Sequence, residues 1–354
     1  MESVNHNTAT NGSRQKVGVA LFGIGRAGLI HARNLVRNPR VELRWIVEEN
    51  VDLANGYIEE LYLSDTRVAT SSGVEAVWND EKTAAIVVCV PTFLHESLIL
   101  AGLKAGKAVF CEKPISSSLT QTKQCYLKAK EVGKPLYCAL NRRFDPAIRK
   151  LRSRVLKGEL GQVQCIKTTS RDAPFPPAQY LKISGGFFHD CAVHDIDLIC
   201  WIVGERPDTV FAQGHAFHDC IREMDDVDQA NITLKFPSGI MATIDINREA
   251  VYGYDQRLEV LGSKGMLQTV NQVDSPVALH NEKGENMDAI QPSFPERYSR
   301  SYVLEMEHFL DLVEGKTKEI EVTMEDTLCT SWIADLCESS MHEGKLMKFT
   351  EPVC

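Results

Sequence analysis

The sequence predicts two unlike halves: an α/β domain built on a doubly wound parallel sheet, then an α+β domain with a large, open, mainly antiparallel sheet. In the first half, near-continuous apolar runs alternate with stretches of helical periodicity. This pattern is typical of parallel strands that are buried on both faces. In the second half, apolar and polar residues alternate strictly, as they do in a sheet with one core face. The length of 354 residues suits two domains.

Each half divides into elements. The first half is predicted to contain the strands Val17–Phe22, Val41–Val47, Thr83–Val90, Lys107–Cys111 and Pro135–Leu140, and the helices Ala27–Arg37, Glu96–Ala105 and Thr120–Val132. The second half is predicted to contain the strands Val163–Ser170, Thr209–Ala216, Ala230–Phe236, Ile240–Asn247, Arg257–Leu261 and Met266–Val270, with helices over 189–203 and Tyr302–Val313. We therefore expect a disordered tail over residues 1–15 and domains over 16–140 and 141–354.

The ends of two helices carry their own signals. Gly204 is expected to end the helix over 189–203. A last helix is expected to begin after Thr323, whose hydroxyl forms a capping box with Asp326. This last helix is expected to pack back on the first domain.

Composition narrows the class of protein. A net charge of −9 and a pI near 5.6 argue against nucleic-acid binding, which needs a basic face, and against binding to anionic membranes. No apolar run approaches the roughly 20 residues of a membrane span. The eleven cysteines show no CxxC spacing, which favours free thiols in a reducing cytosol. We expect a cytoplasmic protein without nucleic-acid or membrane partners.

A glycine-rich turn follows the first strand and opens the first helix. Gly23 permits the tight turn, Gly25 allows a pyrophosphate to approach the backbone, and Gly28 allows close helix–strand packing. Glu48 ends the next strand about 20 residues later, the spacing for a carboxylate that binds the adenosine ribose. A carboxylate there repels a 2′-phosphate, so NAD is favoured over NADP; Glu49 is an alternative for this role. The competing interpretation is a structural turn with a solvent-exposed carboxylate. The turn reads Gly23-Ile24-Gly25-Arg26-Ala27-Gly28.

The helix over 189–203 is apolar except for one polar stripe. Asp190, His194, Asp197 and Trp201 fall on that stripe at helical spacing. Burying a row of ionisable groups on a helix costs free energy unless the groups have hydrogen-bond partners or face a cleft. One hypothesis is that His194 is a general base which Asp190 orients. The alternative is a satisfied His–Asp network in the core.

Zinc binding by this helix is a further alternative. His189, Cys191 and His194 carry the right donor atoms. Their spacing spreads them around the helix, so they do not converge on one ion without other ligands. We predict no metal site.

Lys113 follows a buried strand and precedes Pro114. It therefore lies at the carboxyl edge of the parallel sheet, where open α/β folds bind ligands, and the proline restricts it to an extended conformation. A lysine fixed there can donate to a substrate hydroxyl and stabilise alkoxide character as hydride leaves. The competing interpretation is an exposed lysine in a turn.

Three polar clusters end strands or precede them. Forked donors and carboxylates suit a ligand that carries many hydroxyls. Each cluster is equally explained by salt bridges between the domains. The clusters are Asn141-Arg142-Arg143-Phe144-Asp145, Arg171-Asp172 and Tyr254-Asp255-Gln256.

From about Lys16 to Phe349 the chain resembles the glucose-fructose oxidoreductase / inositol dehydrogenase / rhizopine catabolism (Gfo/Idh/MocA) family. The specific motifs are Glu112-Lys113-Pro114, and Gly185-Gly186 followed by Asp190 and His194-Asp195-Ile196-Asp197. The resemblance implies that His194 is the acid/base, that Lys113 stabilises the alkoxide and that Asp190 orients. It also implies a two-domain fold whose open sheet mediates dimers or tetramers.

Within this family, two segments resemble the inositol 2-dehydrogenase branch: Asn141 to Asp145, and Tyr252-Gly253-Tyr254-Asp255-Gln256-Arg257. The leading hypothesis is thus NAD-dependent oxidation of a secondary hydroxyl of a cyclic polyol, myo-inositol to 2-inosose. The alternatives are a sugar or dihydrodiol dehydrogenase that uses NADP(H), and a regulatory protein that binds NAD without catalysis.

These inferences together predict three groups of site residues. The catalytic residues are Lys113, Asp190 and His194. The residues expected to bind the cofactor are Gly23, Ile24, Gly25, Arg26, Ala27, Gly28, Glu48, Pro91, Thr92, His95, Glu112 and Lys113. The residues expected to bind the substrate are Asn141, Arg142, Arg143, Arg171, Asp172 and Tyr254.

Overall fold

A computed structural model of the chain describes residues 15–351, so the predicted tail falls outside the described residues except for residue 15. The first part contains β1 (Val17–Phe22), α1 (Arg26–Arg37), β2 (Val41–Val47), α2 (Val51–Glu60), β3 (Arg67–Ala69), η1 (Ser71–Gly73), α3 (Glu75–Trp78), β4 (Thr83–Val88), η2 (Thr92–Leu94), α4 (His95–Lys104), β5 (Ala108–Glu112), α5 (Leu119–Val132) and β6 (Leu136–Ala139).

The second part begins with η3 (Asn141–Phe144), α6 (Pro146–Leu156), β7 (Val163–Arg171), α7 (Ala178–Leu181), the π-helical turn η4 (Phe188–Ala192), α8 (Val193–Val203), β8 (Thr209–His215), α9 (Asp219–Arg222), β9 (Gln229–Lys235) and β10 (Met241–Asn247). It continues with β11 (Asp255–Gly262), β12 (Gly265–Thr269), β13 (Ala278–Asn281), β14 (Gly284–Met287), α10 (Phe294–Arg297), α11 (Ser299–Val313), α12 (Met324–Glu343) and β15 (Met347–Lys348).

The first sheet is parallel throughout, with strand order β3-β2-β1-β4-β5-β6. This is the doubly wound order, in which ligands bind at the carboxyl ends of the strands. All five predicted strands are present. The prediction missed β3 because that strand has only three residues and none of them is fully buried, so it leaves no apolar run to detect.

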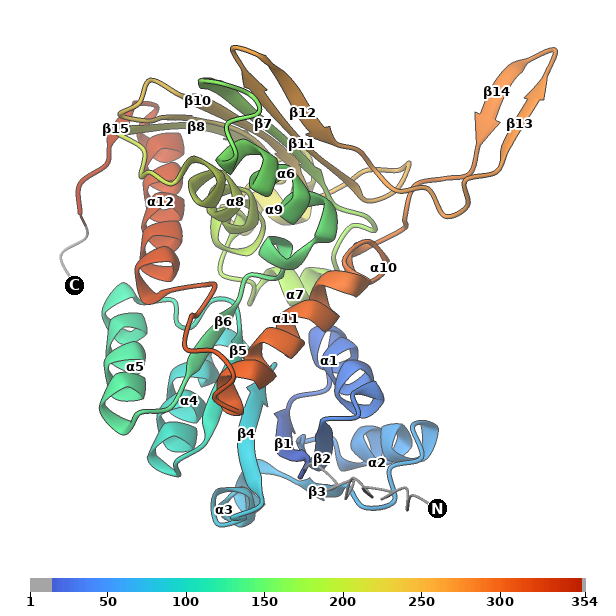
Figure 1. The fold of residues 1–354 in the computed structure, drawn as a ribbon, viewed down its shortest axis with the longest axis vertical. Helices are drawn as coiled ribbons and strands as arrows, with labels where there is room; N and C mark the ends of the chain where they lie inside the picture. Colours follow the sequence, from blue (N-terminus) through green and yellow to red (C-terminus); the bar gives the residue numbers. More distant parts are fainter. Residues whose placement is uncertain (1–14, 352–354) are drawn as a thin grey trace, which may run out of the picture.

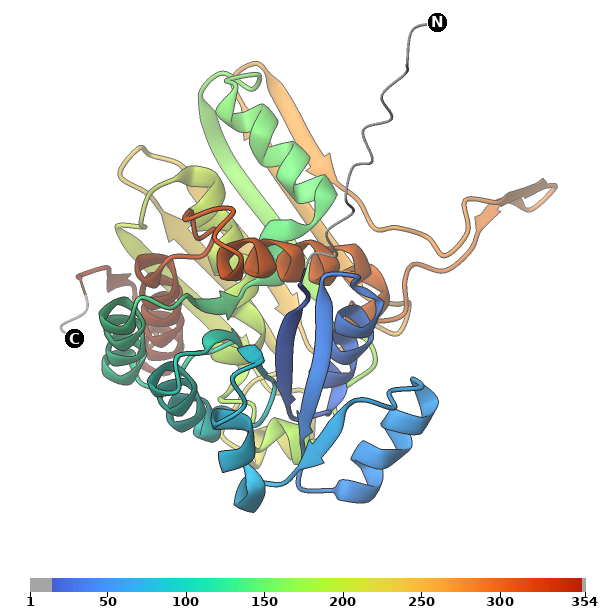
Figure 2. The ribbon, with the colours of Figure 1, turned by 60° about the horizontal axis from the view of Figure 1, so that its bottom comes forward.

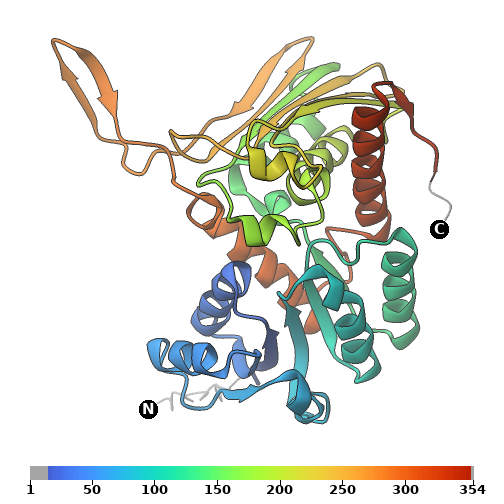
Figure 3. The same cartoon turned by 180° about the vertical axis from the view of Figure 1, so that it is seen from behind.

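The second sheet has seven strands in the order β12-β11-β7-β10-β9-β8-β15. It is antiparallel except for the pair β10–β7, so the prediction of a mainly antiparallel sheet is confirmed. Helices α6, α8 and α12 cover one of its faces (Figure 1). Within residues 15–351 no helix covers the opposite face, as the view from behind also shows (Figure 3).

Two hydrophobic cores lie side by side, one for each sheet. Helix α11 crosses from the second part and gives Met306, Phe309 and Leu310 to the core of the first (Figure 2). The last helix, α12, packs mainly in the second core. It also packs against α5 of the first part, where the hydroxyls of Tyr126 and Thr327 lie 2.9 Å apart, and its Met324 packs against the first core. Both α11 and α12 therefore pack against the first domain, and the prediction named only α12.

Local signals at helix ends are confirmed. Thr323 and Asp326 form the predicted capping box of α12. Gly204 ends α8 in the left-handed conformation with φ of 76°. The predicted helix over 189–203 differs in its first turn, which is the π-helical η4. Such wide single turns occur frequently at functional sites.

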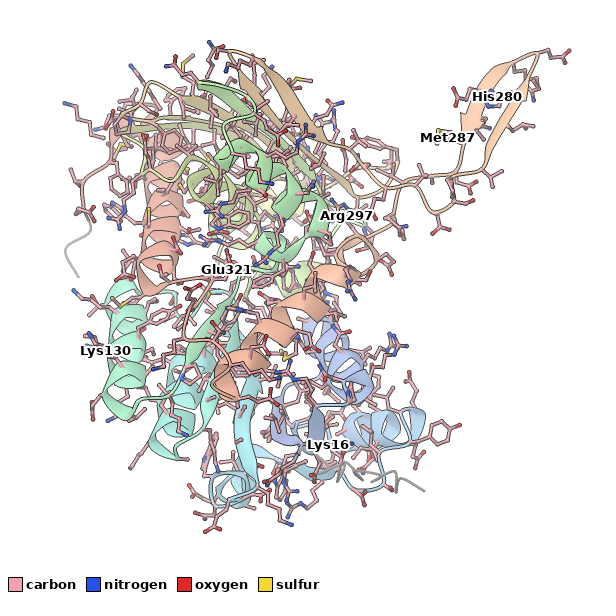
Figure 4. All side chains as sticks on the ribbon, viewed as in Figure 1. Lys16, Lys130, His280, Met287, Arg297 and Glu321 are labelled. Carbon is pink, nitrogen blue, oxygen red and sulfur yellow. The ribbon has the colours of Figure 1, made fainter. Side chains whose placement is uncertain are left out.

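Strands β13 and β14 form a hairpin arm that projects away from both sheets (Figure 1). His280 and Met287 mark its two strands in Figure 4. In the part of the chain that the structure describes, no helix is long and apolar enough to cross a membrane.

Candidate active site

A cleft of about 380 Å³ opens where the carboxyl ends of the parallel strands face the second sheet. Its walls come from both parts of the chain, so neither part forms the site alone. Of the predicted residues, the cleft is lined by Gly25, Arg26, Ala27, Pro91, Thr92, His95, Glu112, Lys113, Asn141, Arg142, Asp172, Asp190, His194 and Tyr254.

The glycine turn forms one wall of the cleft. Gly23 has φ of 81°, and a Cβ there would lie 2.7 Å from the Cys89 carbonyl oxygen. A Cβ on Gly28 would collide with the Gly23 carbonyl oxygen, whereas a Cβ on Gly25 would meet nothing within 4 Å. The space over Gly25 and the uncapped start of α1 fit a pyrophosphate, which backbone N–H groups at a helix N-terminus bind.

Glu48 supports this turn from the end of β2. Its carboxylate accepts hydrogen bonds from the backbone N–H groups of Ile24, at 3.2 Å, and Asn50, at 3.1 Å. Glu49, the alternative, accepts from Ser71 N–H at 2.8 Å instead. Ile24 and Glu48 therefore shape the turn from behind the cleft, and the carboxylate of Glu48 suits ribose hydroxyls better than a 2′-phosphate.

Two more predicted cofactor residues brace loops beside the turn. The ring nitrogens of His95 lie 2.7 Å from the Pro114 carbonyl oxygen and 2.8 Å from that of Val90. Burial lowers the pKa of His95. Glu112 Oε1 lies 2.8 Å from Nε2 of the fully buried His31. Both side chains fix the backbone around Lys113.

Lys113 and Asp190 meet across the cleft. The Lys113 ammonium donates to the Asp190 carbonyl oxygen at 2.5 Å and to its Oδ1 at 3.0 Å. Tyr180 donates to the same Oδ1 at 2.6 Å, and Arg248 donates to Oδ2 at 2.9 Å. Burial alone would raise the pKa of Asp190, but the charges of Lys113 and Arg248 outweigh burial and hold that pKa well below its usual range. Asp190 is therefore a fixed carboxylate.

His194 lies in the same cleft, one turn after Asp190. Its Nδ1 is buried and has no hydrogen-bond partner among residues 15–351. Burial, helped by the charges of Arg142 and Lys113, holds the pKa of His194 well below its usual value. A neutral imidazole with a free ring nitrogen can accept a proton.

The expected role of Asp190 needs a correction. Its carboxylate oxygens are bonded to Lys113, Tyr180 and Arg248, so they orient the lysine and not the imidazole. The physical reason is the π-helical turn that ends at Ala192. That turn changes the angular spacing of a regular α-helix, on which the prediction of a direct Asp190–His194 contact depended.

The substrate side of the cleft is polar. Arg142 donates to Ser170 Oγ at 3.2 Å and forms an ion pair with Asp195 at 3.2 Å, and it lies 3.5 Å from the Tyr254 hydroxyl. The amide nitrogen of Asn141 is buried and lacks a partner in the described chain. Burial, helped by the charge of Asp190, raises the pKa of Asp172 to about 6. Unsatisfied donors and a carboxyl group in one cleft suit a ligand with hydroxyls.

The structure does not bring two predicted substrate residues into this cleft. Arg143 is buried against Asp197, with Nη2 2.6 Å from Oδ1, and borders a separate groove of about 890 Å³. Arg171 pairs with Asp245 and Tyr252. Side chains alternate along β7, so Ser170 faces the cleft and Arg171 faces the other side. The polar stripe of the helix over 189–203 also divides between two places. Asp190 and His194 line the cleft, whereas Asp197 contacts Arg143 and Trp201 donates to Glu321 at 3.0 Å.

The zinc alternative gains no support. His189 Nε2 lies 2.9 Å from Asp335 of α12, whereas His194 lines the cleft. Among the residues that the structure describes, no group of three potential ligands is placed to hold a metal ion.

Sequence reasoning missed several side chains that line the cleft or lie directly behind it. Tyr180 lies in the short helix α7, in a segment without periodicity, so no signal pointed to it. Arg248 follows a predicted strand directly, the same signal that singled out Asp172, and was overlooked. Further cleft residues that were missed are Ser170, Asn247, Tyr298 and Tyr302.

Comparison with known proteins extends this picture. Residues 17–140 match an oxidoreductase family with an NAD-binding Rossmann fold, and residues 148–268 match the GFO/IDH/MocA C-terminal domain. The chain is 34% identical to the myo-inositol 2-dehydrogenase of Thermotoga maritima over 95% of its own length and 99% of that protein. It is 33% identical to the scyllo-inositol 2-dehydrogenase (NAD(+)) of Bacillus subtilis over 85% and 88% of the two chains.

A solved structure agrees with these matches. The myo-inositol dehydrogenase of Corynebacterium glutamicum superposes with a TM-score of 0.86 at 31% identity, over 95% of this chain and 100% of the other. A dinucleotide-binding domain and a cleft that holds a lysine, a carboxylate and an imidazole define an NAD-dependent dehydrogenase. The chain belongs to the Gfo/Idh/MocA oxidoreductase family.

Proposed function

We propose that this dehydrogenase oxidises a secondary hydroxyl of a cyclic polyol, and that it converts myo-inositol to 2-inosose. The observation that carries the proposal is a cleft that combines Lys113, Asp190 and His194 with unsatisfied polar groups on the substrate side. The names of the relatives in Thermotoga maritima and Bacillus subtilis support an inositol as substrate.

Each side chain has a defined task in the reaction. The Lys113 ammonium donates a hydrogen bond to the reacting hydroxyl oxygen and stabilises its developing negative charge. Neutral His194 accepts the hydroxyl proton. NAD, when bound, supplies the acceptor for the hydride that leaves the carbinol carbon. Asp190 holds Lys113 in place, so the protein positions the reacting groups before the chemical step.

The remaining polar groups recognise the other hydroxyls of the ring. Asp172 accepts hydrogen bonds when it is ionised, and the buried amide of Asn141 donates them. Arg142 and Tyr254 already contact each other and form a fixed edge of the pocket. Because a buried polar group is costly when it stays unpaired, this wall favours polyols over ligands that lack hydroxyls.

We further propose that the protein self-associates as a homodimer or homotetramer. The uncovered face of the seven-stranded sheet exposes an apolar row that runs across four adjacent strands. Paired positions place these side chains beside one another in the order Met241, Cys165, Leu261 and Met266. Three of the four are between 40% and 54% exposed. An apolar row of this kind is typical of a face that packs against another subunit.

A substrate screen tests the proposed reaction. NAD reduction is measured at 340 nm with myo-inositol, scyllo-inositol, other inositol isomers, monosaccharides and trans-dihydrodiols, and each assay is repeated with NADP. We expect turnover with myo-inositol and a clear preference for NAD. Activity confined to scyllo-inositol would reassign the isomer, and activity confined to sugars or diols would overturn the inositol proposal. A preference for NADP would reject the role of Glu48.

Two variants connect that activity to the cleft. Lys113→Ala and His194→Ala are each expected to lower kcat by about 10²- to 10⁴-fold, the usual contribution of a positioned proton donor or acceptor. NAD affinity, followed by nucleotide fluorescence on titration, should stay within about threefold because these side chains act on the reacting hydroxyl. Near-wild-type turnover in either variant would contradict the mechanism.

A further inference from the structure

Arg248 lies directly after β10 and is completely buried behind the cleft. Its guanidinium lies over the ring of Phe187, 5.3 Å from the ring centre. Nη1 donates to Asp190 Oδ2 at 2.9 Å, and Nη2 lies 3.8 Å from a carboxylate oxygen of Asp226. Arg248 does not line the cleft, and its side chain reaches the site through its hydrogen bond to Asp190.

The Asp190 carboxylate is divided between two sets of donors. Arg248 takes Oδ2, whereas Lys113 and Tyr180 take Oδ1. Because each oxygen has its own partners, the carboxylate cannot turn about its axis without breaking at least one hydrogen bond. Arg248 therefore fixes the carboxylate that, together with the Asp190 carbonyl oxygen, holds the Lys113 ammonium.

Keeping a guanidinium in this place is costly. Burying a charge pays a large desolvation penalty that only excellent pairing offsets. Yet Nε and Nη2 of Arg248 have no hydrogen-bond partner within residues 15–351. An apolar side chain of similar volume would avoid this penalty. The single close hydrogen bond of Arg248, to Asp190, is what the buried charge provides.

The charges around Asp190 also indicate that Arg248 serves to hold this carboxylate. The titratable and charged groups that face it are Lys113, Arg248, Tyr180, Asp172, Cys191 and His194, with Asp226 behind Arg248. Two cations thus oppose the repulsion between Asp190 and Asp172. Without Arg248, Asp190 would keep only the charge of Lys113 against this repulsion, whereas Asp172 would keep the charges of Arg142 and Lys113.

We propose that Arg248 is a positioning residue for the dehydrogenase reaction: it fixes the Asp190 carboxylate so that Lys113 is aimed at the substrate oxygen. This inference rests on the proposed function and identifies what holds its catalytic lysine in place. Arg248 is not itself a catalytic residue.

The test compares Arg248→Gln and Arg248→Lys with a matched control, Arg297→Gln. Arg297 (labelled in Figure 4) is also buried and ion-paired, with Nη1 2.6 Å from Asp145 Oδ2, but it lies outside the cleft. We expect Arg248→Gln to lower kcat by about 10²-fold, the effect of a misplacement of about 1 Å. The acid limb of kcat/KM should move to higher pH, because Arg248 lowers the pKa of both Asp190 and Asp172. Arg248→Lys, which keeps the charge, should restore most of kcat and the wild-type profile.

The control separates positioning from folding. Arg297→Gln is expected to lower the melting temperature while it leaves kcat and the pH profile unchanged. If Arg248→Gln behaved in the same way, Arg248 would be a structural residue and the inference would be overturned.

A second readout makes the inference independent of the substrate. Lys113 is modified with trinitrobenzenesulfonate in the wild-type protein and in Arg248→Gln. Peptide mass spectrometry follows the rate at which Lys113 is modified in each protein. We expect faster modification in Arg248→Gln because the ammonium is no longer held on Asp190. Equal rates would overturn the inference even if the wild-type enzyme oxidised none of the polyols, a result that would refute only the proposed function.

Discussion

At the scale of single residues, neighbouring carboxyl groups in the cleft have opposite properties. The pKa of Asp190 lies well below its usual range, because Lys113 and Arg248 outweigh its burial. Burial, helped by the charge of Asp190, raises the pKa of Asp172 to about 6. Such a pair of separated pKa values is typical of sites that divide tasks between two acids. Asp190 is thereby suited to hold a cation, and Asp172 to sense pH.

This difference predicts the pH dependence of catalysis. We expect kcat/KM for polyol oxidation to fall as pH decreases through about 6, because protonated Asp172 loses an acceptor for substrate hydroxyls. His194 does not account for this limb, since burial, with the charges of Arg142 and Lys113, holds its pKa well below its usual value. Asp172→Asn should therefore raise KM and abolish the acid limb near pH 6; an unchanged limb would mean that another group titrates there.

Stability provides an independent check on Asp172. A carboxyl whose pKa is raised in the folded state binds more protons there than in the unfolded chain, so its ionisation destabilises the fold as pH rises from about 4 to about 6. Asp172→Asn removes this penalty. The variant should melt at a higher temperature than wild type at pH 7, and the difference should shrink as pH approaches 4.

At the scale of elements, the turn between β1 and α1 shows how two glycines serve different ends. Gly28 is required for packing, because a Cβ there would collide with the Gly23 carbonyl oxygen. Gly25 borders open space in the cleft and has φ of −65°, a value that any residue adopts. The fold therefore tolerates a side chain at Gly25, whereas a bound pyrophosphate does not.

Alanine substitutions separate the two roles. Gly25→Ala should keep the wild-type melting temperature while it weakens NAD binding by about tenfold or more, since the methyl group fills the space through which the pyrophosphate approaches. Gly28→Ala should lower the melting temperature by several degrees and weaken NAD binding as a consequence. Calorimetry and NAD titration of both variants check this, and an unaffected NAD affinity in Gly25→Ala would place the pyrophosphate elsewhere.

At the scale of the whole molecule, the second sheet has one face covered by helices and one uncovered face. The row of Met241, Cys165, Leu261 and Met266 crosses the uncovered face. We propose that this face forms an interface between identical subunits, because a two-fold axis lets one apolar row pack on its own copy.

Charged substitutions test this interface. Leu261→Asp is expected to convert the proposed oligomer into monomers of 39.5 kDa, because a carboxylate would be desolvated at the centre of the proposed contact. Leu127→Asp is the matched control, since Leu127 is similarly exposed but lies on α5. Light scattering coupled to gel filtration measures both masses. A Leu261→Asp protein of unchanged mass would show that the subunits meet elsewhere.

The sequence predicted most elements and the central residues because their signals are local. Apolar runs identified the buried strands, and the glycine turn, Lys113, Asp190 and His194 each lie within a short motif. Contacts between residues that lie apart along the chain were harder to predict from the sequence. Tyr180 and Arg248 reach Asp190 from 10 and 58 positions away, and no motif connects them. Arg171 was misplaced because neighbouring residues along β7 face opposite sides, and Arg143 because it lies in η3, where it bonds to Asp197.

The sequence by itself determined the fold class and the dinucleotide turn and identified the candidate reactive groups, because periodicity and short motifs depend on neighbours along the chain. Only the tertiary structure decided which of those groups act on one another. It placed Asp190 on Lys113 instead of His194, turned Arg143 and Arg171 away from the cleft, and buried Arg248 behind Asp190. The physical reason is that the cleft is formed by two domains, and hydrogen bonds between them depend on backbone geometry at each strand end and at one π-helical turn.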